Sequence, residues 1–309
     1  MAAVVTGGAG FIGSHLVEKL RNSGSEVRVV DDGTTGDVLR LNAGVSVWKK
    51  DISQFRERDW ESVLNPGDTV FHLAARKLNT PNVSDQELLA TNLGATIALA
   101  RVAKAVAVRK IVFTSSLYAY GHHDIGPTLE TQTPLPRTLY GTSKLAGEHA
   151  LTSVLDSSDV DWTSARLYFA YGPKQYPGAG YKSVIVKNFE RIRKGLRPIV
   201  CGSGTQELDY VFVDDVVSAL QSLAESGRRA EVYNVSSGGG ISIQELTNLM
   251  LREAGRPDLR PLFVESDWTE GTSRVGNNSK LSSELGWVPQ VPLDAGLART
   301  WSDICSGRS

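Results

Sequence analysis

The feature that most constrains this sequence is a glycine-rich turn near its amino end, within residues 3–31. Two valines ahead of the turn predict a short apolar strand, and the turn then satisfies both G-x-x-G-x-x-G and the stricter G-x-G-x-x-G. The glycines concerned are Gly7, Gly8, Gly10 and Gly13. Because glycine has no Cβ, the backbone can come close to a pyrophosphate at such a turn. The pattern therefore predicts a strand, a phosphate-binding turn and a helix.

The helix and strand that follow the turn support this interpretation. Apolar residues recur at every fourth position after it, at Ile12, Leu16 and Leu20. This spacing predicts one buried helix face, and the amino end of the helix offers free N–H groups to an anion. The next predicted strand leads to Asp31, 18 residues after Gly13, where a carboxylate can accept both ribose hydroxyls of an adenine dinucleotide. A glycine turn that merely connects strand and helix is the alternative.

Asp31 also bears on which dinucleotide is bound. Its carboxylate would repel a 2′-phosphate, and no Arg or Lys occurs between Asp31 and Arg40 to bind one. The sequence therefore favours NAD over NADP.

Two further segments are expected to border the cofactor. The strand-like SVWKKD ends at Asp51 and Ile52, which can flank the adenine, although a surface turn can have the same composition. The run TVFHLAA, residues 69–75, is typical of a buried parallel strand and ends in small side chains. Small side chains at this point leave room for the cofactor.

Composition argues for a small-molecule role. The chain has 309 residues, with 33 Lys and Arg against 34 Asp and Glu, so its formal charge of −1 offers no basic field for nucleic acid or anionic lipid. Cys201 and Cys305 are far apart, with no histidine cluster nearby, which indicates neither a disulfide framework nor a metal site. The amino end shows no export signal and no long apolar span, so we expect no membrane partner and a cytoplasmic location.

The middle of the chain predicts a helix and a strand that bear on the site. Residues 85–107 have apolar positions at helical spacing and include Asn92, which is either solvated or placed to hold the catalytic loop through hydrogen bonds. The buried strand 110–116 delivers Ser115 and Ser116 at its carboxyl end. Ligands bind at that edge of an open parallel sheet.

Tyr140 and Lys144 open the next predicted helix. A spacing of four places both side chains on the same helix face. A free tyrosine has a pKa near ~10, so acting as a base near neutrality needs a depression of roughly 3 units, or about 4 kcal/mol. A neighbouring ammonium and a nicotinium ring can supply this together, although a Tyr and a Lys lying on a helix surface by chance is the alternative.

Other polar residues are less informative. His122 and His123 lie in a proline-containing polar loop, where adjacent histidines are more often solvated than catalytic. Pro177, Gly178 and Gly180 favour a domain boundary. We expect residues 1–168 to form the nucleotide domain, residues 169–309 a smaller substrate lobe, and the segment near 210–236 to return to the main sheet.

Six motifs follow one another along the chain: TGGAGFIGSHL, TSSLYAYG, YGTSK, RLYFAYGP, DYVFVDDVV and LGWVP. Together they resemble the extended short-chain dehydrogenase/reductase family, and within it the NAD-dependent sugar-nucleotide epimerase/dehydratase group. The resemblance covers nearly the whole chain. It implies an α/β fold, with a Rossmann-type doubly wound parallel sheet and a smaller mixed α/β lobe at the carboxyl end.

Carried onto this sequence, the resemblance gives a set of cofactor-binding residues. They are Gly7, Gly10, Phe11, Ile12, Gly13, Asp31, Asp32, Asp51, Ile52, Leu73, Ala74, Ala75, Asn92, Tyr140 and Lys144.

The resemblance also implies a cycle of oxidation, rotation and reduction on a nucleotide sugar. Tyr140 as phenolate takes the proton of the sugar's fourth hydroxyl while hydride moves to NAD, and Ser116 hydrogen-bonds that oxygen. Lys144 lowers the pKa of the tyrosine and holds the nicotinamide ribose. The ketone then turns and takes the hydride back on its other face.

Members of the group that eliminate water or carbon dioxide carry carboxylates just after the serine or threonine. Here these positions are Leu117 and Tyr118. Without an acid or base for the sugar's fifth carbon, epimerisation is favoured over dehydration or decarboxylation.

Two departures bear on the substrate. The family usually has Asn where this chain has Phe169 and Arg where it has Leu208, and both usual residues bind the nucleotide diphosphate. Either other cations replace them, or the substrate is not a standard nucleoside-diphosphate sugar. We favour replacement, so the expected substrate-binding residues are Lys77, Ser116, Phe169, Lys182 and Arg274.

Two other activities stay open: a ketosugar reductase that consumes external reduced cofactor, and an NAD-binding regulatory protein without chemistry. The resemblance further implies a homodimer through the helices at 85–107 and 141–157. Neither the nucleotide base nor the sugar is specified by these motifs.

Overall fold

The computed structural model describes residues 2–38, 41, 44–77, 83–121, 126–175, 182–267, 269 and 271–307. Some predictions concern residues outside these ranges, namely His122, His123, Arg40, Pro177, Gly178 and Gly180. Among the helices that the structure describes, none has both the length and the apolar character needed to cross a bilayer.

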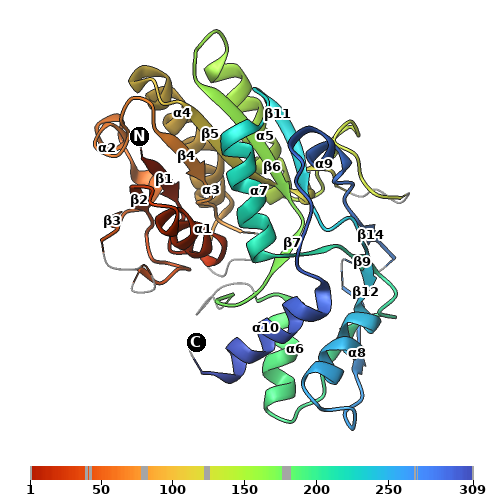
Figure 1. Ribbon diagram of the computed structural model, residues 1–309. Helices are drawn as coiled ribbons and strands as arrows, with labels where there is room; N and C mark the ends of the chain where they lie inside the picture. Colours follow the sequence, from red (N-terminus) through yellow and green to blue (C-terminus); the bar gives the residue numbers. More distant parts are fainter. Residues whose placement is uncertain are drawn as a thin grey trace.

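A seven-stranded sheet forms the larger part of the molecule (Figure 1), in the order β11-β6-β5-β4-β1-β2-β3. All neighbouring strands run parallel. The strands are β1 Ala3–Thr6, β2 Val27–Val30, β3 Ser46–Trp48, β4 Thr69–His72, β5 Lys110–Ser116, β6 Asp161–Leu167 and β11 Glu231–Val235. The order reverses between β1 and β4, and ligands bind at the carboxyl edge beside such a reversal. The predicted Rossmann-type doubly wound sheet is confirmed.

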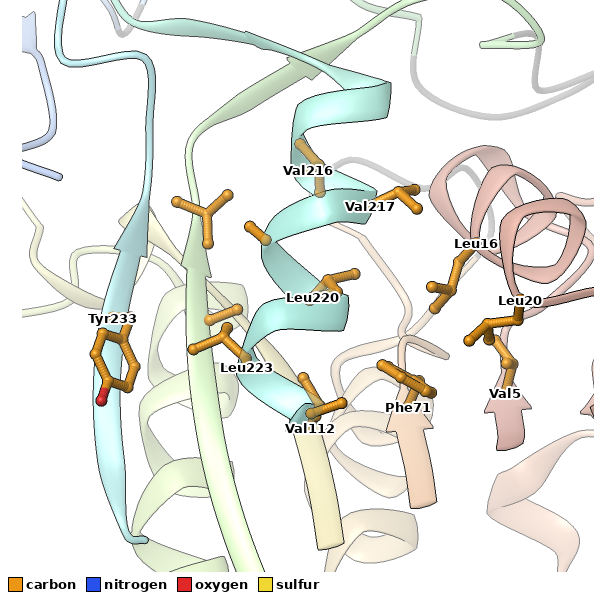
Figure 2. Close-up of a cluster of buried hydrophobic side chains, with 14 of the residues drawn as sticks. Val5, Leu16, Leu20, Phe71, Val112, Val216, Val217, Leu220, Leu223 and Tyr233 are labelled. Atoms are coloured by element: carbon orange, nitrogen blue, oxygen red, sulfur yellow. The ribbon is translucent and has the colours of Figure 1, made fainter. Parts of the chain in front are cut away.

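Helices cover both faces of this sheet because successive side chains of a strand point to opposite faces. On one face lie α1 (Phe11–Asn22) and α7 (Val213–Ser226), and Figure 2 shows their leucines and valines meeting Val5, Phe71 and Val112. On the other face Val4 and Ile111 join the cluster formed by α2 (Glu57–Glu61), α4 (Ala95–Val106) and α5 (Leu139–Leu155). The strands are therefore buried on both sides, as the apolar runs predict.

The long helix predicted over 85–107 is interrupted. It consists of α3 (Asp85–Leu89), a π-helical turn η3 (Ala90–Gly94) and α4, and the turn contains Asn92. Ser84 caps α3 by accepting a hydrogen bond from the backbone N–H of Glu87. Such π turns are frequent at functional sites.

A smaller lobe built on short sheets adjoins the carboxyl edge, and Figure 1 places it below the main sheet. It has its own apolar core, which includes Phe189, Leu246, Met250 and Leu297. Its strands are β7 Phe169–Tyr171, β8 Ile199–Cys201, β9 Glu207–Leu208, β10 Tyr210–Phe212, β12 Ile241–Ser242, β13 Leu262–Val264 and β14 Ser273–Arg274. Its helices are α6 Val184–Arg193, α8 Ile243–Glu253 and α10 Leu293–Cys305, with α9 Ser279–Leu285 beside β11. This mixed arrangement is the smaller α/β lobe that the motifs predict.

Candidate active site

One cavity runs along the carboxyl edge of the main sheet and gathers most of the predicted site residues. Its wall includes Gly7, Gly10, Phe11, Ile12, Gly13, Asp31, Asp32, Asp51, Ile52, Leu73, Ala74, Ala75, Lys77, Ser116, Tyr140 and Lys144. We refer to its two parts as the Asp31 end and the Tyr140 end. Asn92, Phe169, Lys182 and Arg274 are not part of the lining.

The glycine turn forms a close-fitting cradle between β1 and α1. A Cβ on Gly13 would lie 2.1 Å from the carbonyl oxygen of Gly7, and Gly7 itself has a φ of +70°. Only glycine fits at these positions. Helix α1 begins directly after Gly10 and has no acidic residue in its first turn, so its amino end is open to a pyrophosphate.

Asp31 is fixed at the end of β2 by backbone hydrogen bonds. Its Oδ2 accepts from the N–H of Ala9 at 2.9 Å, and its Oδ1 accepts from the N–H of Gly33 at 2.9 Å. The side chain is buried, and burial raises the pKa of Asp31 while the two backbone hydrogen bonds act to lower it. A rigid carboxylate beside a glycine cradle fits an adenine dinucleotide with free ribose hydroxyls.

Arg76 is a cavity residue that the sequence reasoning missed. It follows β4, and its guanidinium donates to Asp32, Asp51 and Thr34. Burial acts to lower the pKa of Arg76, but the charges of the two aspartates raise it overall. Arg76 directly follows residues 69–75, which were predicted to border the cofactor, so its place in the sequence could have identified it as a cavity residue.

Ser116, Tyr140 and Lys144 meet at the Tyr140 end, as their motifs predict. Ser116 ends β5, whereas Tyr140 and Lys144 lie one turn apart at the start of α5. Thr138 caps this helix by accepting a hydrogen bond from the N–H of Gly141 at 3.0 Å. Ser116 and Tyr140 share a side-chain hydrogen bond.

Lys144 is almost completely buried behind the tyrosine. Its Nζ donates to the carbonyl oxygen of Thr114 at 2.7 Å and lies 6.0 Å from the centroid of the Tyr140 ring. Burial lowers the pKa of Lys144 to about 7, the charge of Glu148 acts to raise it, and the charge of Lys77 lowers it further.

Tyr140 does not have a depressed pKa in the protein alone. Burial raises the pKa of Tyr140 to about 12, and the hydrogen bond with Ser116 lowers it by less. This differs from the sequence-based reasoning, which weighed the neighbouring ammonium but not the burial of the phenol. A role for Tyr140 as a base near neutral pH would therefore need a further positive charge, such as that of an oxidised nicotinamide, at this end of the cavity.

Asn92 lies behind the cavity wall. Its Oδ1 accepts from the N–H of Arg76 at 2.7 Å, while its Nδ2 donates to the carbonyl oxygen of Arg76 at 2.9 Å and to Ser143 Oγ at 3.0 Å. Ser143 in turn donates to the carbonyl oxygen of Tyr140. The amide thus joins the segment after β4 to helix α5, which carries Tyr140, in agreement with the positioning alternative for this residue.

The three basic residues predicted to bind the substrate differ in their position relative to the cavity. Lys77 is exposed on the cavity wall, but Lys182 pairs with Glu190 at 2.7 Å outside it. The guanidinium carbon of Arg274 lies 5.6 Å from the centroid of the Tyr118 ring, and Tyr118 itself lines the cavity. Arg274 is therefore one aromatic ring away from the lining.

Phe169 and Leu208, which stand where the family usually has Asn and Arg, have apolar or aromatic neighbours. Phe169 packs against Tyr210, with ring centroids 5.7 Å apart, and Leu208 is 5 % exposed within the core of the lobe. Neither side chain can donate a hydrogen bond to a diphosphate.

Two neighbours of Ser116 complete the Tyr140 end. Tyr118 meets the Tyr140 ring edge-on, at a centroid distance of 5.8 Å. Ser115 also belongs to the cavity wall, but its side chain is 3 % exposed, and its buried Oγ has no hydrogen-bond partner among the described residues.

Comparison with known proteins agrees with this geometry. A model of the NAD dependent epimerase/dehydratase family matches residues 3–236. A UDP-glucose 4-epimerase of Mycolicibacterium smegmatis is 33 % identical, over 97 % of each chain, and a dTDP-glucose 4,6-dehydratase of an Actinoplanes species is 30 % identical, over 100 % of this chain and 99 % of the relative.

Solved structures show the same likeness. The UDP-glucose 4-epimerase of Thermotoga maritima with UDP-glucose has a TM-score of 0.92 at 32 % identity, and the complex of the Thermus thermophilus enzyme with NAD has 0.88 at 31 %. Both cover 100 % of each chain. The cofactor is NAD, and the chain belongs to the NAD-dependent epimerase/dehydratase family.

Proposed function

We propose that the chain is a nucleotide-sugar 4-epimerase that acts on UDP-glucose or a related UDP-sugar. The observation that carries this proposal is the Tyr140 end itself, where Ser116, Tyr140 and Lys144 meet and no carboxylate belongs to the described cavity wall. Among the described residues of the cavity wall, the acidic side chains are Asp31, Asp32 and Asp51, all at the Asp31 end.

Tyr140, Ser116 and Lys144 have different roles in the proposed reaction at the sugar's fourth carbon. Tyr140 receives the hydroxyl proton, and Ser116 hydrogen-bonds the same oxygen. Lys144 lies one helical turn behind the phenol, where its protonated form would stabilise the phenolate. Bound NAD, held between the glycine cradle, Asp31 and Lys144, would supply reversible hydride transfer at the fourth carbon, so the overall reaction would have no net redox change.

The absence of an acid next to Ser116 argues against elimination. Leu117 and Tyr118 occupy the two following positions in η4 (Leu117–Ala119), and Leu117 is buried. Dehydration or decarboxylation needs a group that moves a proton at the fifth carbon. The phenol of Tyr118 lies against Tyr140 and is a weaker acid than a carboxyl group.

The diphosphate needs a cation on the substrate side. We propose Lys77 and Arg274 as the groups that replace the missing arginine, because Lys77 lines the cavity and Arg274 lies against the lining residue Tyr118, whereas Lys182 lies outside the wall. A turn of the Tyr118 side chain would expose the guanidinium to the cavity.

The test is conversion of a panel of UDP-sugars by purified protein without added reductant. We expect interconversion of UDP-glucose and UDP-galactose, or of their uronate or N-acetyl forms, and its loss in Tyr140→Phe. Failure across the whole panel would reject the proposal. Stoichiometric consumption of added NADH would instead identify a ketosugar reductase.

We also propose, from the family resemblance, that two copies pair through the helices within 85–107 and 141–157. Light scattering coupled to gel filtration should give twice the mass of one chain. A monomer at micromolar concentration would contradict this.

A further inference from the structure

Arg76 connects three separate segments at the Asp31 end of the cavity. Its Nη2 donates to Asp32 Oδ2 at 2.8 Å and to Asp51 Oδ2 at 2.7 Å, and its Nη1 donates to Thr34 Oγ1 at 2.7 Å. Arg76 follows β4, Asp32 and Thr34 follow β2, and Asp51 follows β3. In the sheet these strands stand in the order β4-β1-β2-β3, so the guanidinium reaches across the end of β1, where the glycine turn lies.

Both ends of this connection are held firmly. The backbone N–H and carbonyl of Arg76 are both bonded to the buried amide of Asn92. Asp32 also accepts from the backbone N–H and hydroxyl of Thr34, and Asp51 accepts from the N–H of Ser53. Burial acts to raise the pKa of Asp32, but the Thr34 hydrogen bonds and Arg76 lower it overall, so the carboxylate stays charged near neutral pH.

An arginine at this edge could instead be a ligand for the 2′-phosphate of NADP. The contacts argue against that role, because both terminal nitrogens are already engaged by two carboxylates and a hydroxyl. A phosphate would have to displace them while lying beside the buried carboxylate of Asp31. The charge of Arg76 is balanced within the protein.

We propose that Arg76, with Asp32, Thr34 and Asp51, is a clasp over the adenosine half of the NAD cavity, and that it must open before the dinucleotide enters or leaves. All four residues line the cavity. The clasp bears on cofactor exchange and retention and does not depend on which sugar is bound. It rests only on NAD as the cofactor.

The test compares cofactor exchange in Arg76→Gln and wild type. Protein loaded with NAD is mixed with an excess of a fluorescent etheno derivative of NAD, and the rate of replacement is followed. Loss of charge-assisted bonds should accelerate exchange about 10-fold to 100-fold, and less NAD should remain after gel filtration. Arg76→Lys should exchange at an intermediate rate, because an ammonium cannot bridge the same partners in one plane.

A matched control is Arg256→Gln, which breaks an Arg–Asp pair with Asp258 on the surface of the smaller lobe. It should exchange at the wild-type rate. Asp51→Asn provides a second way to open the clasp and should also accelerate exchange, which keeps the proposal testable if Arg76→Gln folds poorly.

Equal exchange rates in wild type, Arg76→Gln and Asp51→Asn would overturn the clasp. So would a variant that loses affinity for NADP alone, because Arg76 would then be a phosphate ligand. No sugar takes part in these measurements, so a failure of the epimerase proposal would leave their outcome readable.

Discussion

The two ends of the cavity are built differently. At the Asp31 end, the glycine cradle, the Asp31 carboxylate and the Arg76 clasp all lie in segments that follow strands of the main sheet. Hydrogen bonds join Asp31 to the glycine turn, and Arg76 to Asp32 and Asp51. At the Tyr140 end, the proposed catalytic side chains of β5 and α5 lie beside a lobe in which Phe169 and Leu208 replace the expected polar groups. The cofactor end is therefore fixed by backbone geometry and by mutually bonded side chains, whereas the substrate end depends on individual side chains from two parts of the molecule.

The largest expected effect is at the Tyr140 end. Tyr140→Phe removes the group that takes the hydroxyl proton, so the rate of epimerisation should fall about 100-fold to 10,000-fold. The amount of NAD retained after gel filtration should stay close to that of wild type, because the cradle is untouched. Equal activity of the variant would show that another group takes the proton.

The cradle is the matching target at the Asp31 end. A Cβ at position 13 would meet the carbonyl oxygen of Gly7, so Gly13→Ala should abolish NAD binding and destabilise the fold by about 2–4 kcal/mol. Calorimetric NAD titration and thermal unfolding measure both effects. Gly94→Ala is the control, because its Cβ would meet nothing closer than 3.9 Å; if both variants bind NAD equally, the cradle is not required.

The substrate end can be tested with two cations. Arg274→Gln should raise the KM for a UDP-sugar about 10-fold, through loss of a charge-assisted contact with the diphosphate. Lys182→Gln removes the same charge from a lysine already paired with Glu190, so its KM should change less than about 3-fold. The reverse order of effects would assign the diphosphate to Lys182.

The two ends are also expected to differ in their pH dependence. The pKa of Lys144 is lowered from 10.5 to about 7, so between these values the unfolded chain holds a proton that the folded chain lacks. Stability without cofactor should therefore rise with pH in this window, by up to about 1.4 kcal/mol per unit. Below about 7 the term no longer changes.

Asp32 behaves differently, because its pKa is lowered from 3.8. The stability that it contributes is present above this value and is lost as the pH falls through the folded-state pKa. Thermal unfolding of wild type and Lys144→Met across both windows separates the two. A wild-type stability that runs parallel to Lys144→Met above pH 7 would contradict the burial of a neutral lysine.

Local patterns in the sequence were sufficient for much of this molecule. The glycine spacing, Asp31 and the four-residue step from Tyr140 to Lys144 each depend on short-range geometry. The cavity wall includes Asp31, Tyr140, Lys144 and three of the four glycines, Gly7, Gly10 and Gly13. The Rossmann-type sheet was predictable because several of its strands are short apolar runs that alternate with helical patterns.

The features that could not be predicted from the sequence are contacts between residues that are not adjacent in the chain, and the effects of burial. Arg76 meets Asp32 and Asp51 only because β4, β2 and β3 end at the same edge. Lys182 has the charge expected of a diphosphate ligand, but it forms an ion pair with Glu190 of α6. The raised pKa of Tyr140 follows from burial, which no spacing of residues reveals.

The most direct test of the central claim uses UDP-glucose with deuterium on the fourth carbon of the sugar. If Tyr140 and bound NAD act as proposed, purified protein without added reductant should form UDP-galactose that keeps the deuterium on the same carbon. Loss of the label to solvent, or its transfer to another carbon, would contradict oxidation and re-reduction at one position.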